Sequence, residues 1–223
     1  MTSRERVRAV INHKEADKVA VDCGGMHSSG VSGMTYNALK SHLGITGGHT
    51  RIYDVNQQLV IPEQWYLDRF QIDVVDLARA FSRDSDWADW QLNDGSAAQF
   101  PAWIKHEKRG DRWVALSDDG EVMASMGPNA FYFDQEIYPY YGQSKESFAD
   151  LPESLEKISW TGFADPMTKH ADEPDYYEQV QNAARKLHEE TDYAIMVNYM
   201  SIVFEPAQWL YRNDELFMKM ISE

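Results

Sequence analysis

The stretch of sequence that decides the fold is KVAVDCGGMHSSG, residues 18–30. Residues 19–21 form a short apolar run of the kind that makes a buried parallel strand, and Asp22 closes it. The small polar residues 23–30 then predict a loop at the carboxyl end of that strand, where glycine lets a backbone approach a ligand and side chains supply hydrogen bonds. A tight strand-to-helix turn without a ligand explains the same residues, and this stretch alone does not decide between the two.

Composition sets the class of protein. The chain has 223 residues, of which 43% are hydrophobic and 13% aromatic, which predicts a folded globular protein with a substantial core. Its 21 basic and 36 acidic residues give a formal charge of −15. An acidic surface of this kind repels phosphate, so we expect neither nucleic acid nor an anionic membrane as a partner.

Cysteine usage and the N-terminal sequence bear on location. Cys23 is the single cysteine, which excludes an intrachain disulfide and favours a reducing compartment. The N-terminal residues contain no apolar leader, and no stretch approaches the roughly 20 apolar residues of a membrane span. We therefore expect a cytoplasmic protein.

The hydrophobic pattern alternates between helix and strand. In chain order it predicts a capped helix from Thr2 to about His13, the strand 19–21, a helix over 36–43 stopped by Gly44, helical structure over 53–70, a strand over 72–77, a long loop over 79–94, a helix over 175–190, a strand over 194–197 and a helix over 205–221. Alternation of this kind implies parallel strands joined by crossover helices. Three strands are too few for a covered parallel sheet, so we interpret the chain as the N-terminal part of a larger barrel.

Residues 100–127 depart from this alternation. Three apolar-patterned segments are separated by Gly110-Asp111 and by 118–120, which predicts an antiparallel β-meander inserted into the α/β domain. We expect it to form a flap or wall outside the main core.

Several side chains are candidates for a site at the strand ends. His27 lies in the glycine-serine loop, where it is placed to donate a hydrogen bond to a ligand. The alternative is a surface histidine with no ligand. Asp22 and Asp76 follow the first two strands, while Asn198 and Tyr199 follow the third. Helix capping or loop bracing explains Asp22 equally well, and hydrogen bonding within the loop explains Asn198 and Tyr199 equally well. Cys23 is expected to be a packed small side chain rather than a nucleophile.

The segment 51–58 offers a further group of polar side chains. Asp54, Gln57 and Gln58 could reach the rim of a pocket. Asp54 is also a suitable N-cap for the helix expected after it, and we favour that interpretation.

Three segments together resemble the uroporphyrinogen decarboxylase and cobalamin-dependent methyltransferase superfamily. They are SRERVRAVINHKEADKVAVDCGG (3–25), RIYDVNQQLVIPEQWYLDRFQIDVVDL (51–77) and YAIMVNYMSIVFEPAQWLYRNDELFMKM (193–220). The resemblance implies a (β/α)8 barrel of TIM-barrel type, longer than this chain, with its active site at the carboxyl ends of the strands. It places in one pocket the residues Asp22, His27, Ser28, Ser29, Asp76, Arg79, Asn198 and Tyr199.

Departures from the decarboxylase pattern favour the methyltransferase branch. Decarboxylases of the family carry Arg-Gln-Ala-Gly-Arg after the first strand, where residues 23–27 here read CGGMH. The family's aspartate after the second strand falls near Arg79, and its tyrosine after the third falls at Trp209. An octa-acidic tetrapyrrole needs cationic partners, so decarboxylation is the less favoured alternative.

The methyltransferase branch implies specific partners. Its members move a methyl group between a corrinoid protein and a thiol or folate, so we expect a corrinoid protein and a small methyl donor or acceptor as partners, and leave a homodimer open. Thiol-using members bind zinc through His-x-Cys and a distant Cys. With one cysteine, this segment is expected to bind no cofactor itself, and the zinc ligands are expected beyond Glu223. A truncated, non-catalytic barrel used for binding is the third interpretation.

Overall fold

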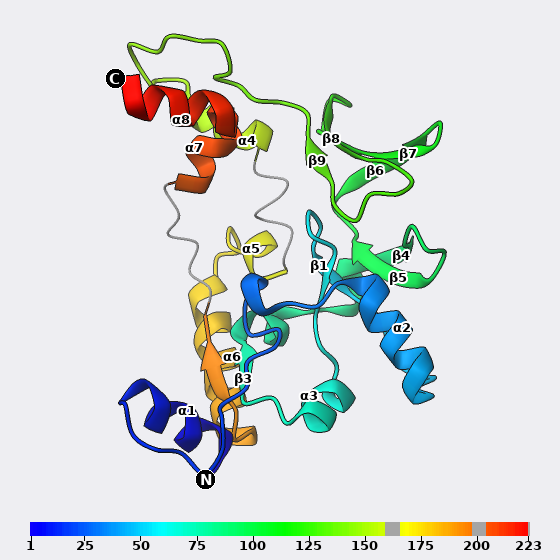
Figure 1. Ribbon diagram of the computed structural model, residues 1–223, viewed down its shortest axis with the longest axis vertical. Helices are drawn as coiled ribbons and strands as arrows, with labels where there is room; N and C mark the ends of the chain where they lie inside the picture. The colour runs from blue at the N-terminus through cyan, green and yellow to red at the C-terminus, as the bar shows by residue number, and fades with distance from the viewer. Residues whose placement is uncertain (159–165, 198–203, 223) are drawn as a thin grey trace. The chain divides into compact units, whose positions relative to one another are not determined.

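The computed structural model describes residues 1–158, 166–197 and 204–222. They form a mixed α/β structure of helices and several small sheets, shown in Figure 1. The described residues group into two compact units. The first comprises 1–102 and 166–197, and the second comprises 103–158 and 204–222.

The first unit contains most of the helices and three small sheets. Its elements are α1 (Ser3–Ile11), η1 (His27–Ser29), α2 (Gly33–Leu43), β1 (Ile52–Asp54), β2 (Leu59–Val60), α3 (Gln64–Phe70), β3 (Val74–Asp76), η2 (Leu77–Phe81), η3 (Asp84–Asp86), β4 (Trp87–Gln91), β5 (Ala97–Pro101), α5 (Pro166–Lys169), α6 (Tyr176–Glu190) and β10 (Ala194–Met196). The η elements are short 3-10 helices.

The parallel pair β3–β10 is the part of this unit that follows the α/β pattern. Val74 lies opposite Ala194, and Asp76 lies opposite Met196. Helices α1 and α6 both contact β10 (Figure 1). The predicted strands 72–77 and 194–197, their parallel direction and the crossover helix 175–190 are confirmed.

The predicted buried strand over 19–21 is wrong. Val19 is 81% exposed, and no β-ladder includes this segment. It runs beside β3, where the amide of Asp73 donates to the carbonyl of Val21 (2.8 Å), but the amide of Val21 donates to the side chain of Asp73 (2.9 Å). In a β-ladder both hydrogen bonds would join backbone groups of the two segments. Here the amide of Val21 is bonded to the carboxylate of Asp73 instead, so the ladder does not form.

The predicted helical structure over 53–70 is correct only for its last part, α3. Residues before it form the hairpin of β1 and β2, in which Ile52 pairs with Val60. The side chain of Asp54 accepts a hydrogen bond from the amide of Gln57 (2.9 Å), and Gln58 has φ +57°. Local bonding of this type makes a turn and competes with a helix, so Asp54 closes a hairpin and is not the N-cap we expected.

The predicted long loop over 79–94 is also wrong in its second half. Strand β4 pairs with β5 in an antiparallel hairpin, with Trp90 opposite Ala98. Trp90 stacks on Phe100 with ring centroids 4.6 Å apart, which buries both rings. Aromatic pairing across strands stabilises this hairpin although its sequence lacks a clear alternation.

Two predicted helix boundaries are confirmed. Thr2 and Glu5 form a reciprocal capping box at the start of α1. Gly44 ends α2 in the left-handed conformation, with φ +69°. The apolar residues Val10 and Ile11 of α1 are nevertheless exposed.

The second unit contains the predicted meander and the C-terminal helices. Its elements are β6 (Lys105–Arg109), β7 (Arg112–Leu116), β8 (Val122–Met126), β9 (Asp134–Gln135), α4 (Leu151–Ile158), α7 (Phe204–Tyr211) and α8 (Asn213–Ser222). The strands form one antiparallel sheet in the order β6-β7-β8-β9. The turns at Gly110 and Gly120 have positive φ, as hairpin connections often require.

The helices of the second unit pack around a small core of Tyr140, Ile158 and Leu210. The single helix predicted over 205–221 is two helices, because Arg212 has φ +66° and ends α7 before α8 begins.

No sheet formed by the described residues closes into a barrel. The observed architecture is therefore α/β with small open sheets. The interpretation of residues 1–223 as part of one barrel domain stays a prediction.

Candidate functional site

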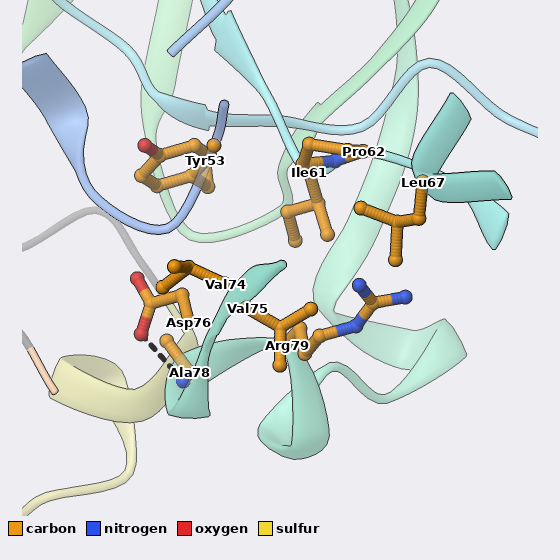
Figure 2. Close-up of a pocket in the computed structure, with 10 residues that line it drawn as sticks. Tyr53, Ile61, Pro62, Leu67, Val74, Val75, Asp76, Ala78 and Arg79 are labelled. Carbon is orange, nitrogen blue, oxygen red and sulfur yellow. Dashed lines mark hydrogen bonds between the residues drawn. The ribbon is translucent and has the colours of Figure 1, made fainter. Parts of the chain in front are cut away.

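A pocket lies at the carboxyl end of β3, against the hairpin β1–β2 and the start of α3 (Figure 2). Its cavity measures about 20 Å³, which is room for little more than a water molecule. Its walls are mainly apolar and include Ile61, Pro62, Leu67, Val74 and Val75. The polar groups of the lining are Tyr53, Asp76 and Arg79.

Asp76 stands at the end of β3 and turns the chain into η2. Its Oδ1 accepts a hydrogen bond from the amide of Ala78 (2.9 Å), which caps the short helix. The carboxylate is half-buried and lines the pocket, as Figure 2 shows. Asp76 thus caps η2 and also lines the pocket.

Arg79 follows three residues later on η2 and is also half-buried in the pocket lining. In Figure 2 its guanidinium extends toward Leu67 and away from the carboxylate of Asp76. No hydrogen bond or ion pair joins Arg79 to any residue in the part of the chain that the structure describes. Burial lowers the pKa of Arg79, but an arginine stays protonated at neutral pH.

Gly24 forms part of the pocket wall and needs to be glycine. Its φ is +92°, and a Cβ at this position would lie 2.4 Å from Cγ of Pro62. The positive φ expected of a glycine in this loop is therefore confirmed here, and the close approach is to the ring of Pro62.

His27 lies beside the pocket lining rather than in it. Its Nε2 is 3.9 Å from Oδ2 of Asp54, and its ring centroid is 5.1 Å from that of Tyr53, which does line the pocket. Asp54 is only 3% exposed and also accepts hydrogen bonds from the amide and the side chain of Gln57. Burial raises the pKa of Asp54, while Gln57 and His27 oppose the rise.

The remaining candidates in the loop after residue 21 do not line the pocket. Asp22 is exposed and accepts a hydrogen bond from the amide of Gly25 (2.9 Å). Ser29 donates to the carbonyl of Met26 (3.1 Å), and Ser28 is exposed. Asp22 and Ser29 thus brace the loop.

Asn198 and Tyr199 lie outside the described residues. Strand β10, which precedes them, ends at Met196 opposite Asp76.

Cys23 lies against an aromatic side chain. Its sulfur is half-buried and lies 3.0 Å from the hydroxyl of Tyr66. Burial, together with the neighbouring thiol, raises the pKa of Tyr66.

Within the described ranges, no three His, Cys, Asp or Glu side chains gather in a way that could hold a metal ion. Among the same residues, no helix has both the length and the apolar character needed to cross a bilayer.

Sequence reasoning missed two features of this region. It did not place Asp54 beside His27, because it assigned residues 53–70 to helix; the Asp54–Gln57 spacing of a turn was the signal available. It did not identify Ile61 and Leu67 as an apolar wall of the pocket. The buried face of such a short segment depends on the element that packs against it, which the sequence does not specify. Asp76 and Arg79 are the two predicted residues that the structure brings together in the pocket.

Comparison with known proteins gives no relationship: no family model, no curated protein and no solved structure matches the chain.

Proposed function

We propose that this chain contributes the substrate pocket of a corrinoid-linked methyltransferase built on a decarboxylase-like barrel. The observation that carries the proposal is the pocket at the carboxyl end of β3, beside its parallel partner β10, lined by Asp76 and Arg79. Barrel enzymes bind their substrates at this end of parallel strands. The three segments that resemble the superfamily include both strands.

The pocket would hold and orient the small methyl acceptor or donor. A corrin macrocycle is far too large for this cavity, so the corrinoid is assigned to a partner protein, where it would supply or accept the methyl group. Holding the small molecule in one orientation lowers the entropic cost of transfer, which is the contribution expected of this chain.

Zinc does not fit the described part of the chain, because no suitable ligand group exists there. We therefore assign no step to a metal. The described lining residues also favour methyl transfer over porphyrinogen decarboxylation, since one arginine is a poor match for a substrate with eight carboxylates.

Methyl transfer can be tested with the purified full chain, methylcobalamin as donor, and either a small thiol or tetrahydrofolate as acceptor. The variant Ala78→Phe fills the pocket, and Ala80→Phe adds the same ring at an exposed position of the same short helix. We expect methylated acceptor, detected by mass spectrometry, from the wild type and Ala80→Phe and a loss of product from Ala78→Phe.

Absence of methylated product from a folded wild-type chain with every acceptor would overturn the proposal, as would equal rates from the two variants. Ligand binding that is blocked by Ala78→Phe without any transfer would instead favour a barrel used only for binding.

A further inference from the structure

A groove in the second unit is lined by residues of the meander strands β6, β7 and β8, of helix α4 and of the loops beside them. Its cavity measures about 560 Å³, which is within the range of pockets that hold small molecules. All of its lining residues belong to the second unit, and it shares none with the pocket at the end of β3. A ligand in this groove is therefore a matter separate from the proposed function.

The larger part of the groove surface is apolar. The side chains that form this apolar floor are Trp103, Ile104, Ala115, Leu116, Met123 and Ile137. Ala115 and Met123 are buried in the sheet, and the other four are half-buried. An alkyl chain laid on this floor removes apolar surface from water, and the indole of Trp103 is the kind of ring that attracts a cation most strongly. The floor thus favours a ligand with an apolar body.

The charged groups of the groove are exposed and mainly acidic. Its five carboxylates belong to Asp118, Asp119, Glu121, Glu153 and Glu156, and its two ammonium groups to Lys105 and Lys157. Lys105 already forms an ion pair with Asp118 (2.9 Å). The lining therefore has an excess of negative charge, and two different elements supply it. Three of the acidic residues lie in the turn between β7 and β8, and the other two are one helical turn apart on α4.

Charge complementarity and the apolar floor together define the occupant. A bare metal ion would leave the apolar floor uncovered, and within the described ranges no side chains gather in a way that could hold one. A neutral apolar molecule would cover the floor and leave the carboxylates unmatched. A chain of methylene groups with ammonium groups along it satisfies both parts of the lining. We infer that the groove binds a linear alkyl polyamine, whose ammonium groups meet the carboxylates of the β7–β8 turn and of α4.

The test is isothermal titration of the full chain with spermidine and with 1,8-octanediol, a neutral chain of the same length. We expect spermidine to bind about tenfold more tightly than the diol, because several exposed charge pairs together contribute this much. Magnesium chloride at the same concentration of positive charge should not displace spermidine, since Mg²⁺ gains nothing from the apolar floor.

Two matched double variants locate the site. Glu121→Gln with Glu153→Gln removes one carboxylate from each acidic element of the groove, and we expect the affinity for spermidine to fall about tenfold. Asp111→Asn with Glu146→Gln removes two exposed carboxylates of the same unit outside the groove and should leave the affinity unchanged. All four positions are exposed, and circular dichroism checks that both variants fold.

Equal affinity for spermidine and the diol, or no binding of spermidine, would overturn the inference. So would an equal loss in the two double variants or displacement by Mg²⁺, because spermidine would then be only a counter-ion of an acidic protein. Binding of an octalysine peptide without binding of spermidine would assign the groove to a basic protein partner instead and would also overturn it.

Discussion

The guanidinium of Arg6, in the first helix, is hydrogen-bonded to the carboxylate of Asp73, the residue immediately before β3. Both side chains are buried, with Asp73 1% and Arg6 6% exposed. The same carboxylate accepts from the amide of Val21, and Arg6 also donates to Asp17 (2.7 Å). One buried ion pair thus joins helix α1, the extended segment at Val21 and strand β3.

Removal of the Asp73 carboxylate should destabilise the first unit. Asp73→Ala removes the buried partner of Arg6, which keeps only the half-exposed Asp17, and it also leaves the amide of Val21 without its acceptor. We expect a loss of about 2–3 kcal/mol in the free energy of unfolding. Urea unfolding followed by circular dichroism measures the change. Glu15→Ala removes an exposed carboxylate from the same region and should change stability by less than about 0.5 kcal/mol. Equal effects of the two substitutions would show that the ion pair contributes little.

Gly24 should be less tolerant of alanine than Gly44. Both have positive φ, but a Cβ at Gly24 would lie 2.4 Å from Pro62, while a Cβ at Gly44 would have no heavy atom within 4 Å. Gly44→Ala should therefore cost about 1 kcal/mol from backbone strain alone. Gly24→Ala adds overpacking and should cost about 2 kcal/mol or more. Thermal denaturation of the two variants gives the comparison, and a smaller effect at Gly24 would contradict the close approach.

Glu173 should make the stability of the first unit sensitive to acid. A hydrogen-bonded ion pair with Arg83, together with hydrogen bonds from Gln179 and His170, lowers the pKa of Glu173 from 4.5 to about 2. Because the folded chain binds this proton more weakly than the unfolded chain, the contribution is present above the unfolded pKa of 4.5 and is lost as pH falls toward 2.

The variant Glu173→Gln should consequently lose less stability than the wild type over that pH interval. Urea unfolding at several pH values measures the difference: the urea midpoint of Glu173→Gln should fall less steeply with decreasing pH than that of the wild type. Glu178→Gln, an exposed neighbour on α6, serves as the control and should follow the wild type. If the urea midpoint of Glu173→Gln fell with pH as steeply as that of the wild type, other carboxylates would control the loss of stability in acid.

Tyr140 should be essential to the core of the second unit. Its ring is fully buried against Ile158 and Leu210, and its amide donates to the carbonyl of Leu210 (2.8 Å). Tyr140→Ala removes a large buried side chain and should cost about 3 kcal/mol or more. Hydrogen exchange should increase in α4 and α7, whose residues form that core. Tyr132→Ala, at an exposed ring of the same unit, should leave exchange in both helices unchanged; an equal increase would contradict this role for Tyr140.

Features that depend on residues adjacent in the chain could be predicted from the sequence. The capping box of Thr2 and Glu5, the helix end at Gly44 and the turns of the meander follow from local hydrogen bonding and from the backbone freedom of glycine. The helix 176–190 follows from its apolar periodicity. Two strands of the α/β pattern and their parallel direction were likewise predictable, because a connection through a helix favours that arrangement.

Tertiary structure alone decided which apolar and charged groups are buried. Residues 19–21 have the composition of a buried strand, yet Val19 is exposed, and the amide of Val21 donates to the side chain of Asp73 and not to a strand backbone. Asp54 is buried because a turn, rather than a helix, brings it beside His27 and Gln57. Arg79 is chemically like any other arginine in the sequence. Only the packing of β3 against the hairpin and α3 places it in the lining of a mainly apolar pocket.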